Sequence, residues 1–263
     1  GLYATGPTVV REPAPARDHT ERMLQAQGAH LRIQGDTIIL EPPSRLHPLD
    51  LTVPGDFSSA AFLIVAGLLV PEAEVVIEGV GVNPRRIGLL DVLEQMGARV
   101  WLSHRREISG EPVADLRVRT STLHGVTVEG EVVVRMIDEF PILAVAATQA
   151  EGVTLVRGAA ELRAKESDRI ATTVAELRKM GADIVERPDG FLVRGPTPLH
   201  GAVVSSHGDH RLGMALVVAG LIAAGETVVQ DTDCIADSFP GFEGTLGHIL
   251  EGLNFQPARL GSV

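Results

Sequence analysis

The chain has 263 residues, of which 44% are hydrophobic and 22% charged, and its formal net charge is −11. This composition is typical of a globular protein with a large core, and the low aromatic share of 3% means that the core is mainly aliphatic. The negative charge argues against a nucleic-acid or anionic-membrane surface, because both require a basic footprint. A local cationic pocket for a small anion remains compatible with it.

The single cysteine, Cys234, excludes an intrachain disulfide framework and a cysteine-based metal site. No apolar run reaches the roughly 18 residues of a membrane span, and the first residues show no signal-peptide pattern. We therefore expect a cytoplasmic protein without a membrane or nucleic-acid partner.

Two kinds of segment recur along the chain. The first is an amphipathic helix that ends in Gly-Ala and is followed by a strand, at residues 21–29, 90–98 and 174–182. A glycine just after the last periodic residue is a common helix stop, because it adopts a left-handed conformation at little cost. The polar faces of these helices predict that they lie on the outside.

The second recurring segment is an apolar helix that runs into a β-branched strand. The helices are predicted at residues 58–69, 141–150 and 212–224, before strands at 74–77, 153–156 and 227–229. Because these helices are apolar nearly all round, we expect them to be buried on every side.

Turn signals at residues 34–36 and 187–190 predict hairpins between the units. Each unit is then strand, helix, strand, helix and hairpin, about 70 to 85 residues long. The predicted fold is α/β, with repeated βαβαββ units around buried helices. Pro54-Gly55 marks a boundary, so residues 1–54 would be the remnant of one domain and residues 55–263 a second domain of three units.

The first ten residues match residues 220–229 position for position, as the end of a buried helix and the next strand. We therefore expect the chain to be a fragment of a longer protein.

A charged segment, residues 161–170, holds six ionisable side chains. If it is helical, Lys165 and Arg169 lie at i and i+4 on one face and repel each other by roughly a few tenths of a kcal/mol. An anion bound between them would explain the arrangement, whereas the alternative is a solvated, salt-bridged helix start.

Each buried helix begins with an aspartate at or near the N-cap: Asp56, Asp138 and Asp209. Capping alone accounts for such residues. If the units repeat, however, the helix N-termini point in a common direction and together form a site for anions. His210 and Arg211, directly behind an aspartate cap, are cations that a bound anion would explain.

At these residues the sequence resembles the 5-enolpyruvylshikimate-3-phosphate synthase (EPSP synthase) family. The motifs are Arg163–Arg169, Gly208–Arg211, Met136–Pro141 and Arg17–Glu21. The last two are most similar to the bacterial group that includes glyphosate-insensitive members. The resemblance implies the two-domain enolpyruvyl transferase architecture with its active site between the domains, and a C-terminal fragment in which the N-terminal domain is incomplete.

The family transfers the enolpyruvyl group of phosphoenolpyruvate to the 5-hydroxyl of shikimate 3-phosphate. By motif match, Asp138 corresponds to the proton acceptor for this hydroxyl and Glu166 to the group that transfers a proton at the methylene carbon. His210 would supply a supporting catalytic contact. The resemblance implies no metal and no organic cofactor.

The same match assigns the substrate ligands. Lys165 and Arg17 would contact shikimate 3-phosphate, while Arg169 and Arg211 would bind phosphoenolpyruvate through guanidinium groups suited to carboxylate and phosphate. Asp237 stands where some members carry a lysine, and a carboxylate cannot replace that cation.

The remaining family motifs lie outside this chain, so we expect it to be inactive, or nearly so, without a missing N-terminal segment, which is a further expected partner. One alternative is a non-catalytic folding or complementation fragment. Another is the sister enzyme that acts on UDP-N-acetylglucosamine.

Overall fold

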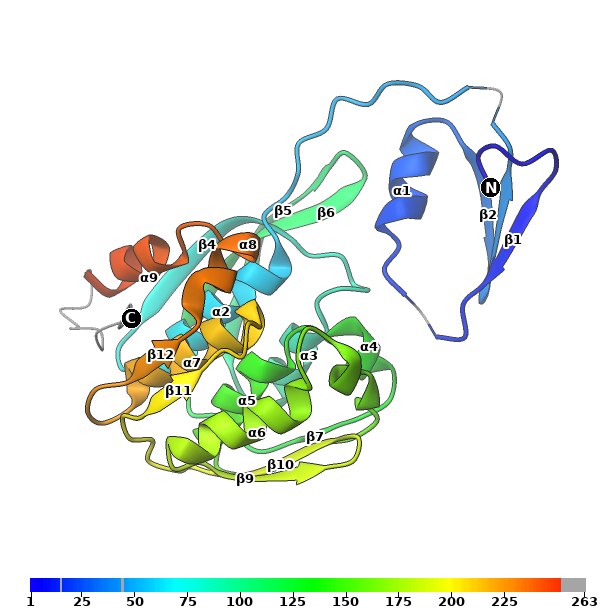
Figure 1. The fold of residues 1–263 in the computed structure, drawn as a ribbon. Helices are drawn as coiled ribbons and strands as arrows, with labels where there is room; N and C mark the ends of the chain where they lie inside the picture. The colour runs from blue at the N-terminus through cyan, green and yellow to red at the C-terminus, as the bar shows by residue number, and fades with distance from the viewer. Residues whose placement is uncertain (15, 44, 252–263) are drawn as a thin grey trace.

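The computed structural model describes residues 1–14, 16–43 and 45–251, and it has a small first unit beside a larger body (Figure 1). The first unit, residues 1–41, contains a three-stranded sheet and one helix, and an extended segment connects it to the body. No helix in the described part of the chain is long and apolar enough to cross a membrane.

Three helices lie side by side in the centre of the larger body: α2 (Phe57–Leu69), α5 (Phe140–Thr148) and α7 (His210–Ile222). Nearly all of their side chains are buried, as their all-round apolar sequences predicted. Their side chains form the centre of the hydrophobic core, which is mainly aliphatic.

The strands form sheets around these helices. The described strands are β1 (Thr8–Arg11), β2 (His30–Gln34), β3 (Thr37–Glu41), β4 (Glu74–Gly81), β5 (Arg99–Ile108), β6 (Glu111–Arg119), β7 (Thr127–Val128), β8 (Gly152–Val156), β9 (Asp183–Arg187), β10 (Gly190–Gly195), β11 (Val203–Ser205) and β12 (Val228–Gln230). The sheet orders are β1-β3-β2, β4-β6-β5, β7-β8-β10-β9 and β11-β12. In the three larger sheets, the second strand of the hairpin (β3, β6 or β10) lies between the first strand of the hairpin and an earlier strand of the chain. The three sheets therefore repeat one arrangement of strands.

The amphipathic helices also form where the sequence predicted them: α1 (His19–Ala26), α3 (Gly88–Gln95) and α6 (Arg169–Lys179). Each ends before a glycine with positive φ, at Gly28, Gly97 and Gly181. The other helical segments are α4 (Glu131–Arg135), η1 (Ala160–Ala164), η2 (Thr232–Cys234), α8 (Ile235–Ser238) and α9 (Phe242–Glu251).

The repeat is less regular than the sequence suggested. Only the unit from β7 to β10 shows all six elements within the described residues; before α2 there is just an isolated bridge, between Gly55 and Val80. After β12 the chain continues as short helices up to residue 251, and residues 252–263 lie outside the described part. The β5–β6 hairpin was expected from the repeat but was not located in the sequence, because a run of charged residues obscures its alternation.

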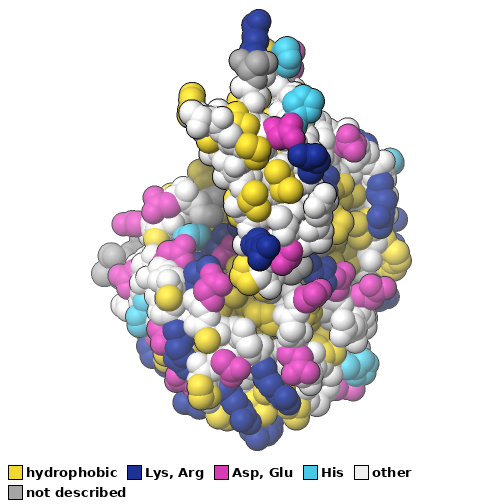
Figure 2. All heavy atoms as spheres, turned by 90° about the vertical axis from the view of Figure 1, so that its right-hand side faces the viewer, with side chains coloured by type: hydrophobic (Ala, Val, Ile, Leu, Met, Phe, Trp, Pro, Cys, Tyr) yellow, Lys and Arg dark blue, Asp and Glu magenta, His cyan; other side chains and the backbone are white. Residues whose placement is uncertain are grey.

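The first unit has little core of its own. Glu21 and Ala29 are its buried residues among those described, whereas Val9, Val10 and Ile33 of its sheet are exposed. Figure 2, viewed from the side of this unit, shows hydrophobic side chains at its surface. Its apolar strands therefore lie against solvent in this chain.

Candidate active site

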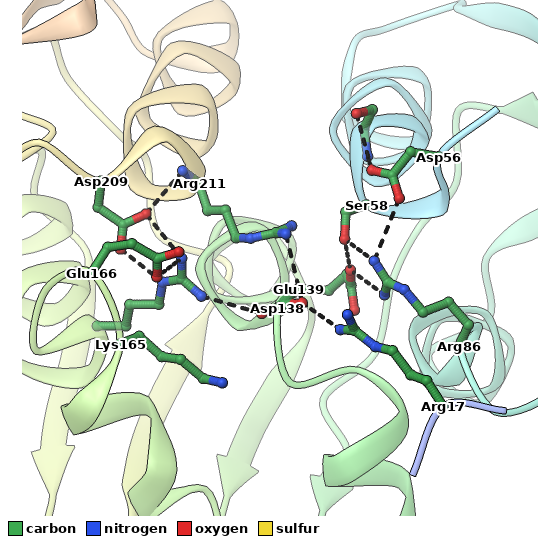
Figure 3. Close-up of polar contacts among 12 residues, drawn as sticks. Arg17, Asp56, Ser58, Arg86, Asp138, Glu139, Lys165, Glu166, Asp209 and Arg211 are labelled. Atoms are coloured by element: carbon green, nitrogen blue, oxygen red, sulfur yellow. Dashed lines mark hydrogen bonds and ion pairs between the residues drawn. The ribbon is translucent and has the colours of Figure 1, made fainter. Parts of the chain in front are cut away.

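The N-termini of the three central helices lie together, as the repeat predicted (Figure 3). Asp56 caps α2 by accepting a hydrogen bond from the backbone N–H of Ser59 at 2.8 Å. Asp209 caps α7 through the N–H groups of Arg211 and Leu212. The N-cap residue of α5 is Glu139, whose side chain makes no capping bond, so Asp138 lies one residue before the cap rather than at it. Asp138 is therefore available for other contacts.

Among the residues that the structure describes, three arginines from separate elements converge on the Asp138 carboxylate. Arg17, in the segment before α1, donates to Oδ2. Nη1 of Arg169, the first residue of α6, donates to Oδ1 at 3.4 Å. Nη2 of Arg211, in the first turn of α7, lies 3.6 Å from Oδ2. The site thus joins the first unit to two helices of the body.

These arginines keep Asp138 ionised. Burial alone would raise the pKa of Asp138, but the charges of Arg211, Arg17 and Arg86 outweigh burial and bring the pKa to about 2. The carboxylate can accept a proton, although it is a weak base while the guanidinium groups surround it.

Arg169 is the most deeply buried cation of the site, with 1% of its surface exposed. Its Nε donates to Asp209 Oδ2 at 2.7 Å and its Nη2 to Oδ1 at 3.2 Å, so the pair is bidentate. Burial would raise the pKa of Asp209, but the hydrogen bond and charge of Arg169 lower it. Asp209, with no exposed surface, therefore aligns Arg169 and caps α7 at the same time.

The predicted pairing of Lys165 and Arg169 on one helical face was wrong. Helix α6 begins only at Arg169, because Asp168 caps it by accepting from the N–H of Ala171, and Lys165 has an extended backbone. The Lys165 ammonium donates to Glu161 at 2.6 Å rather than to the cluster around Asp138. The two cations therefore approach the site from different segments.

The other two predicted catalytic residues border the same cluster. Glu166, half exposed, accepts a hydrogen bond from Arg169 Nη2 at 2.5 Å. His210 is the first residue of α7, and burial together with the charge of Arg211 lowers the pKa of His210 below 6.5. Its imidazole is therefore neutral at neutral pH.

A second buried network, which the sequence did not reveal, lies beside Asp138. Arg86 donates to Glu139 Oε1 at 2.9 Å and to the hydroxyl of Ser58, and it lies 3.6 Å from Asp56 (Figure 3). It therefore ties the start of α2 to the start of α5. Its only signal in the sequence was an adjacent arginine pair before a helix. Asp209, by contrast, could have been found as part of the Gly-Asp-His-Arg motif.

Arg17 reaches the site because its segment is docked on the body. Asn83, which is buried, donates to Asp18 Oδ1 at 2.6 Å and to Glu111 Oε2 at 3.1 Å. His19 Nδ1 lies 2.7 Å from Glu111 Oε1. These contacts fix the residues next to Arg17 at the edge of the site.

Two buried atoms of the site and of the network beside it lack a hydrogen-bond partner within the described residues: Nε of Arg211 and Oε2 of Glu139. A buried guanidinium N–H without an acceptor is costly, which indicates that an anion belongs there. Among residues 1–14, 16–43 and 45–251, no group of three or more His, Cys, Asp or Glu side chains is placed to hold a metal ion. Asp237 lies exposed on α8.

Comparison with known proteins places this geometry in a family. The family model of EPSP synthase (3-phosphoshikimate 1-carboxyvinyltransferase) matches residues 1–246. The chain belongs to the EPSP synthase family. It is 53% identical over 249 residues to the 3-phosphoshikimate 1-carboxyvinyltransferase of Desulforudis audaxviator and 52% identical over 251 residues to that of Geobacter sp. strain M21. Each match covers 95% of this chain and 58% of the relative.

Solved structures confirm the enolpyruvyl transferase fold. EPSP synthase from Acinetobacter baumannii superposes with a TM-score of 0.89 at 41% identity, over 95% of this chain and 58% of that one. The enolpyruvyl transferase NikO from Streptomyces tendae matches at 22% identity with a TM-score of 0.75, over 97% of this chain and 57% of that one, which supports the fold alone. The chain thus spans about three-fifths of the length of its relatives.

Proposed function

We propose that this chain forms the larger part of an enzyme that transfers the enolpyruvyl group of phosphoenolpyruvate to the 5-hydroxyl of shikimate 3-phosphate. The observation that carries the proposal is the convergence of Arg17, Arg169 and Arg211 on one ionised carboxylate at the shared ends of three buried helices. Both substrates are polyanions, and guanidinium groups bind carboxylates and phosphates in bidentate fashion.

The residues divide between the two substrates as follows. Arg169 and Arg211 bind phosphoenolpyruvate, and the unpartnered Nε of Arg211 takes one of its oxygens. Arg17, which reaches Asp138 from the first unit, binds shikimate 3-phosphate. Lys165 turns from Glu161 towards this second substrate, because an ammonium on a flexible side chain can exchange one anionic partner for another.

Proton transfer falls to the carboxylates and to His210. A proton adds to the methylene carbon of phosphoenolpyruvate from Glu166, the 5-hydroxyl oxygen bonds to the neighbouring carbon, and Asp138 takes the hydroxyl proton. Loss of phosphate and of one proton from the new methyl group then restores the double bond. His210, neutral at neutral pH, supports this step with a hydrogen bond.

We further propose that residues 1–54 are the last part of one domain and residues 55–263 the second domain. The exposed strands of the first unit and the extended segment after it support this division. The apolar face around Val10 and Ile33 is covered when the polypeptide that the relatives have in addition is present. That polypeptide also completes the substrate site.

The test is a steady-state assay of phosphate release with both substrates. We expect turnover when the missing family segment is supplied with this chain, and little or none from these 263 residues alone. Replacing Arg169 by alanine should abolish phosphoenolpyruvate binding, measured by titration calorimetry. Unchanged affinity in that variant would remove Arg169 from the site, and robust turnover by the chain alone would show that the site is complete without the segment.

The similarity to the bacterial group with glyphosate-insensitive members stays a prediction. It is tested by inhibition of the completed enzyme with glyphosate, where loss of activity at low inhibitor concentration would contradict it.

A further inference from the structure

Helix α6 is tied to the loop before α7 at two points on one face. At its first residue, Arg169 holds Asp209 through a bidentate ion pair. Seven residues later, Glu176 holds the loop and the strand that leads into it: Nε2 of His207 lies 2.8 Å from its Oε1, and the N–H of Ser205, the last residue of β11, donates to its Oε2 at 3.1 Å. Seven residues are about two turns, so both ties lie on the same side of the helix.

Glu176 is an unusual residue for such a position. It has 1% of its surface exposed, and a buried carboxylate is unfavourable unless it is paired and hydrogen-bonded. Lys179, one turn further, donates to both oxygens, but its own side chain is half exposed. The ion pair with Lys179 could form at the surface and does not explain why the Glu176 carboxylate is buried. The contacts to His207 and Ser205 explain it, because they draw the carboxylate between α6 and the segment before α7.

The loop itself has a backbone that needs support. His207 and Gly208 both have positive φ, at 54° and 72°, and this conformation is uncommon for a residue other than glycine. Such strain persists where the surroundings fix it, and here the imidazole of His207 is fixed by Glu176. The amide of Gly208 also donates to Ser206 Oγ at 3.0 Å.

The next residues along the chain belong to the candidate active site. Asp209 caps α7 and aligns Arg169, His210 is the first residue of the helix, and Arg211 lies in its first turn. Ser205 and Ser206 are also bonded to residues 230 and 231, but these bonds lie before His207. After His207, the tie to α6 is the one at Asp209, so a shift of the loop at His207 moves Arg211 relative to Arg169. These two arginines share Asp138, so their relative position determines whether one anion can bind both.

We propose that Glu176 is a positioning residue that, through His207 and Ser205, sets Arg211 at the correct place beside Arg169 for phosphoenolpyruvate. This inference rests on the proposed function, in which both arginines bind that substrate. Glu176 lies away from the anion and acts only through the loop.

The experiment measures phosphoenolpyruvate binding to the 263-residue chain by titration calorimetry, together with the melting temperature. His207→Ala removes one tie from a half-exposed position, so it should fold normally and bind about tenfold more weakly. Glu176→Ala should bind at least as weakly as His207→Ala. Glu176→Gln, which keeps an oxygen for Ser205 and a polar group for His207, should recover most of the affinity.

Lys179→Ala is the matched control, because it removes a partner of Glu176 that does not belong to the loop. We expect its affinity to stay within twofold of the parent chain. If Glu176→Ala does not fold, the phosphoenolpyruvate affinity of His207→Ala alone tests the inference. Parent-like affinity in His207→Ala, or an equal loss in Lys179→Ala, would overturn the inference. If the parent chain itself binds no phosphoenolpyruvate, the proposed function of the site in this chain fails instead.

Discussion

The guanidinium of Arg211 lies 3.6 Å from the carboxylate of Asp138 and shares it with two other arginines, while its own Nε has no partner among the described residues. Asp138 is therefore an anionic partner that these guanidinium groups already have. A phosphate or carboxylate group that enters the site must compete with it for the guanidinium groups.

Replacing Asp138 by asparagine should consequently tighten phosphoenolpyruvate binding even though it removes the proton acceptor. Loss of a competing ion pair worth roughly 1 kcal/mol corresponds to about threefold to tenfold higher affinity, measured by calorimetry. Asp56→Asn is the control, because the exposed Asp56 lies beside Arg86 and not beside these arginines. Weaker binding in Asp138→Asn would mean that the carboxylate holds the arginines in place for the substrate.

The same ion pairs make the stability of the chain depend on pH. The pKa of Asp138 is lowered from 3.8 to about 2 in the folded state, so its contribution is fully present above pH 3.8 and is lost as the pH falls through 2. The difference between these two pKa values corresponds to roughly 2 kcal/mol. In urea unfolding, the gap in unfolding free energy between the parent chain and Asp138→Asn should narrow by this amount from pH 5 to pH 2. A gap that is constant over this range would contradict the assigned pKa.

Asp209→Ala should be among the most destabilising single substitutions in the site. It leaves the fully buried Arg169 without its bidentate partner, which is expected to lower the unfolding free energy by about 3–5 kcal/mol. Asp183→Ala provides the comparison, because Asp183 pairs with Arg194 at the exposed surface and should cost less than about 1 kcal/mol. If both variants lost the same unfolding free energy, the buried Arg169–Asp209 pair would stabilise the fold no more than the surface pair does.

The central helices were predictable because their sequences are apolar on every side, and burial is the only environment that suits such helices. The positions of Asp138 and Arg211 near helix starts followed from the same pattern, whereas Arg169 was assigned to the site by its family motif. The geometry of Lys165 did not, because a charged segment has no apolar face by which the start of a helix can be located. Asp168, whose side chain caps α6, decided that start.

Contacts between distant segments could not be predicted at all. Arg86 is 53 residues from Glu139 along the chain, and neither local sequence indicates that the two side chains are buried together. The roles of Glu176 and Asn83 likewise depend on which loop packs beside them. Periodicity encodes the burial of an element but not the identity of its polar partners.

Asn83 offers a test of how the first unit contributes Arg17. Its amide donates to Asp18 and Glu111, and its Oδ1 accepts from the N–H of Arg85 at 2.9 Å, so it joins the start of α1 to the body. Asn83→Ala should release this start, because an eight-residue helix is marginal without tertiary support.

Hydrogen–deuterium exchange measures that release. With about 1–3 kcal/mol of hydrogen bonding lost, exchange of the α1 amides should accelerate roughly tenfold or more, while α5 and α7 keep their protection. Gln25→Ala, at an exposed position of the same helix, should leave the exchange of α1 unchanged. If Asn83→Ala left α1 as protected as in the parent chain, Asn83 would not be the residue that holds the segment bearing Arg17 against Asp138.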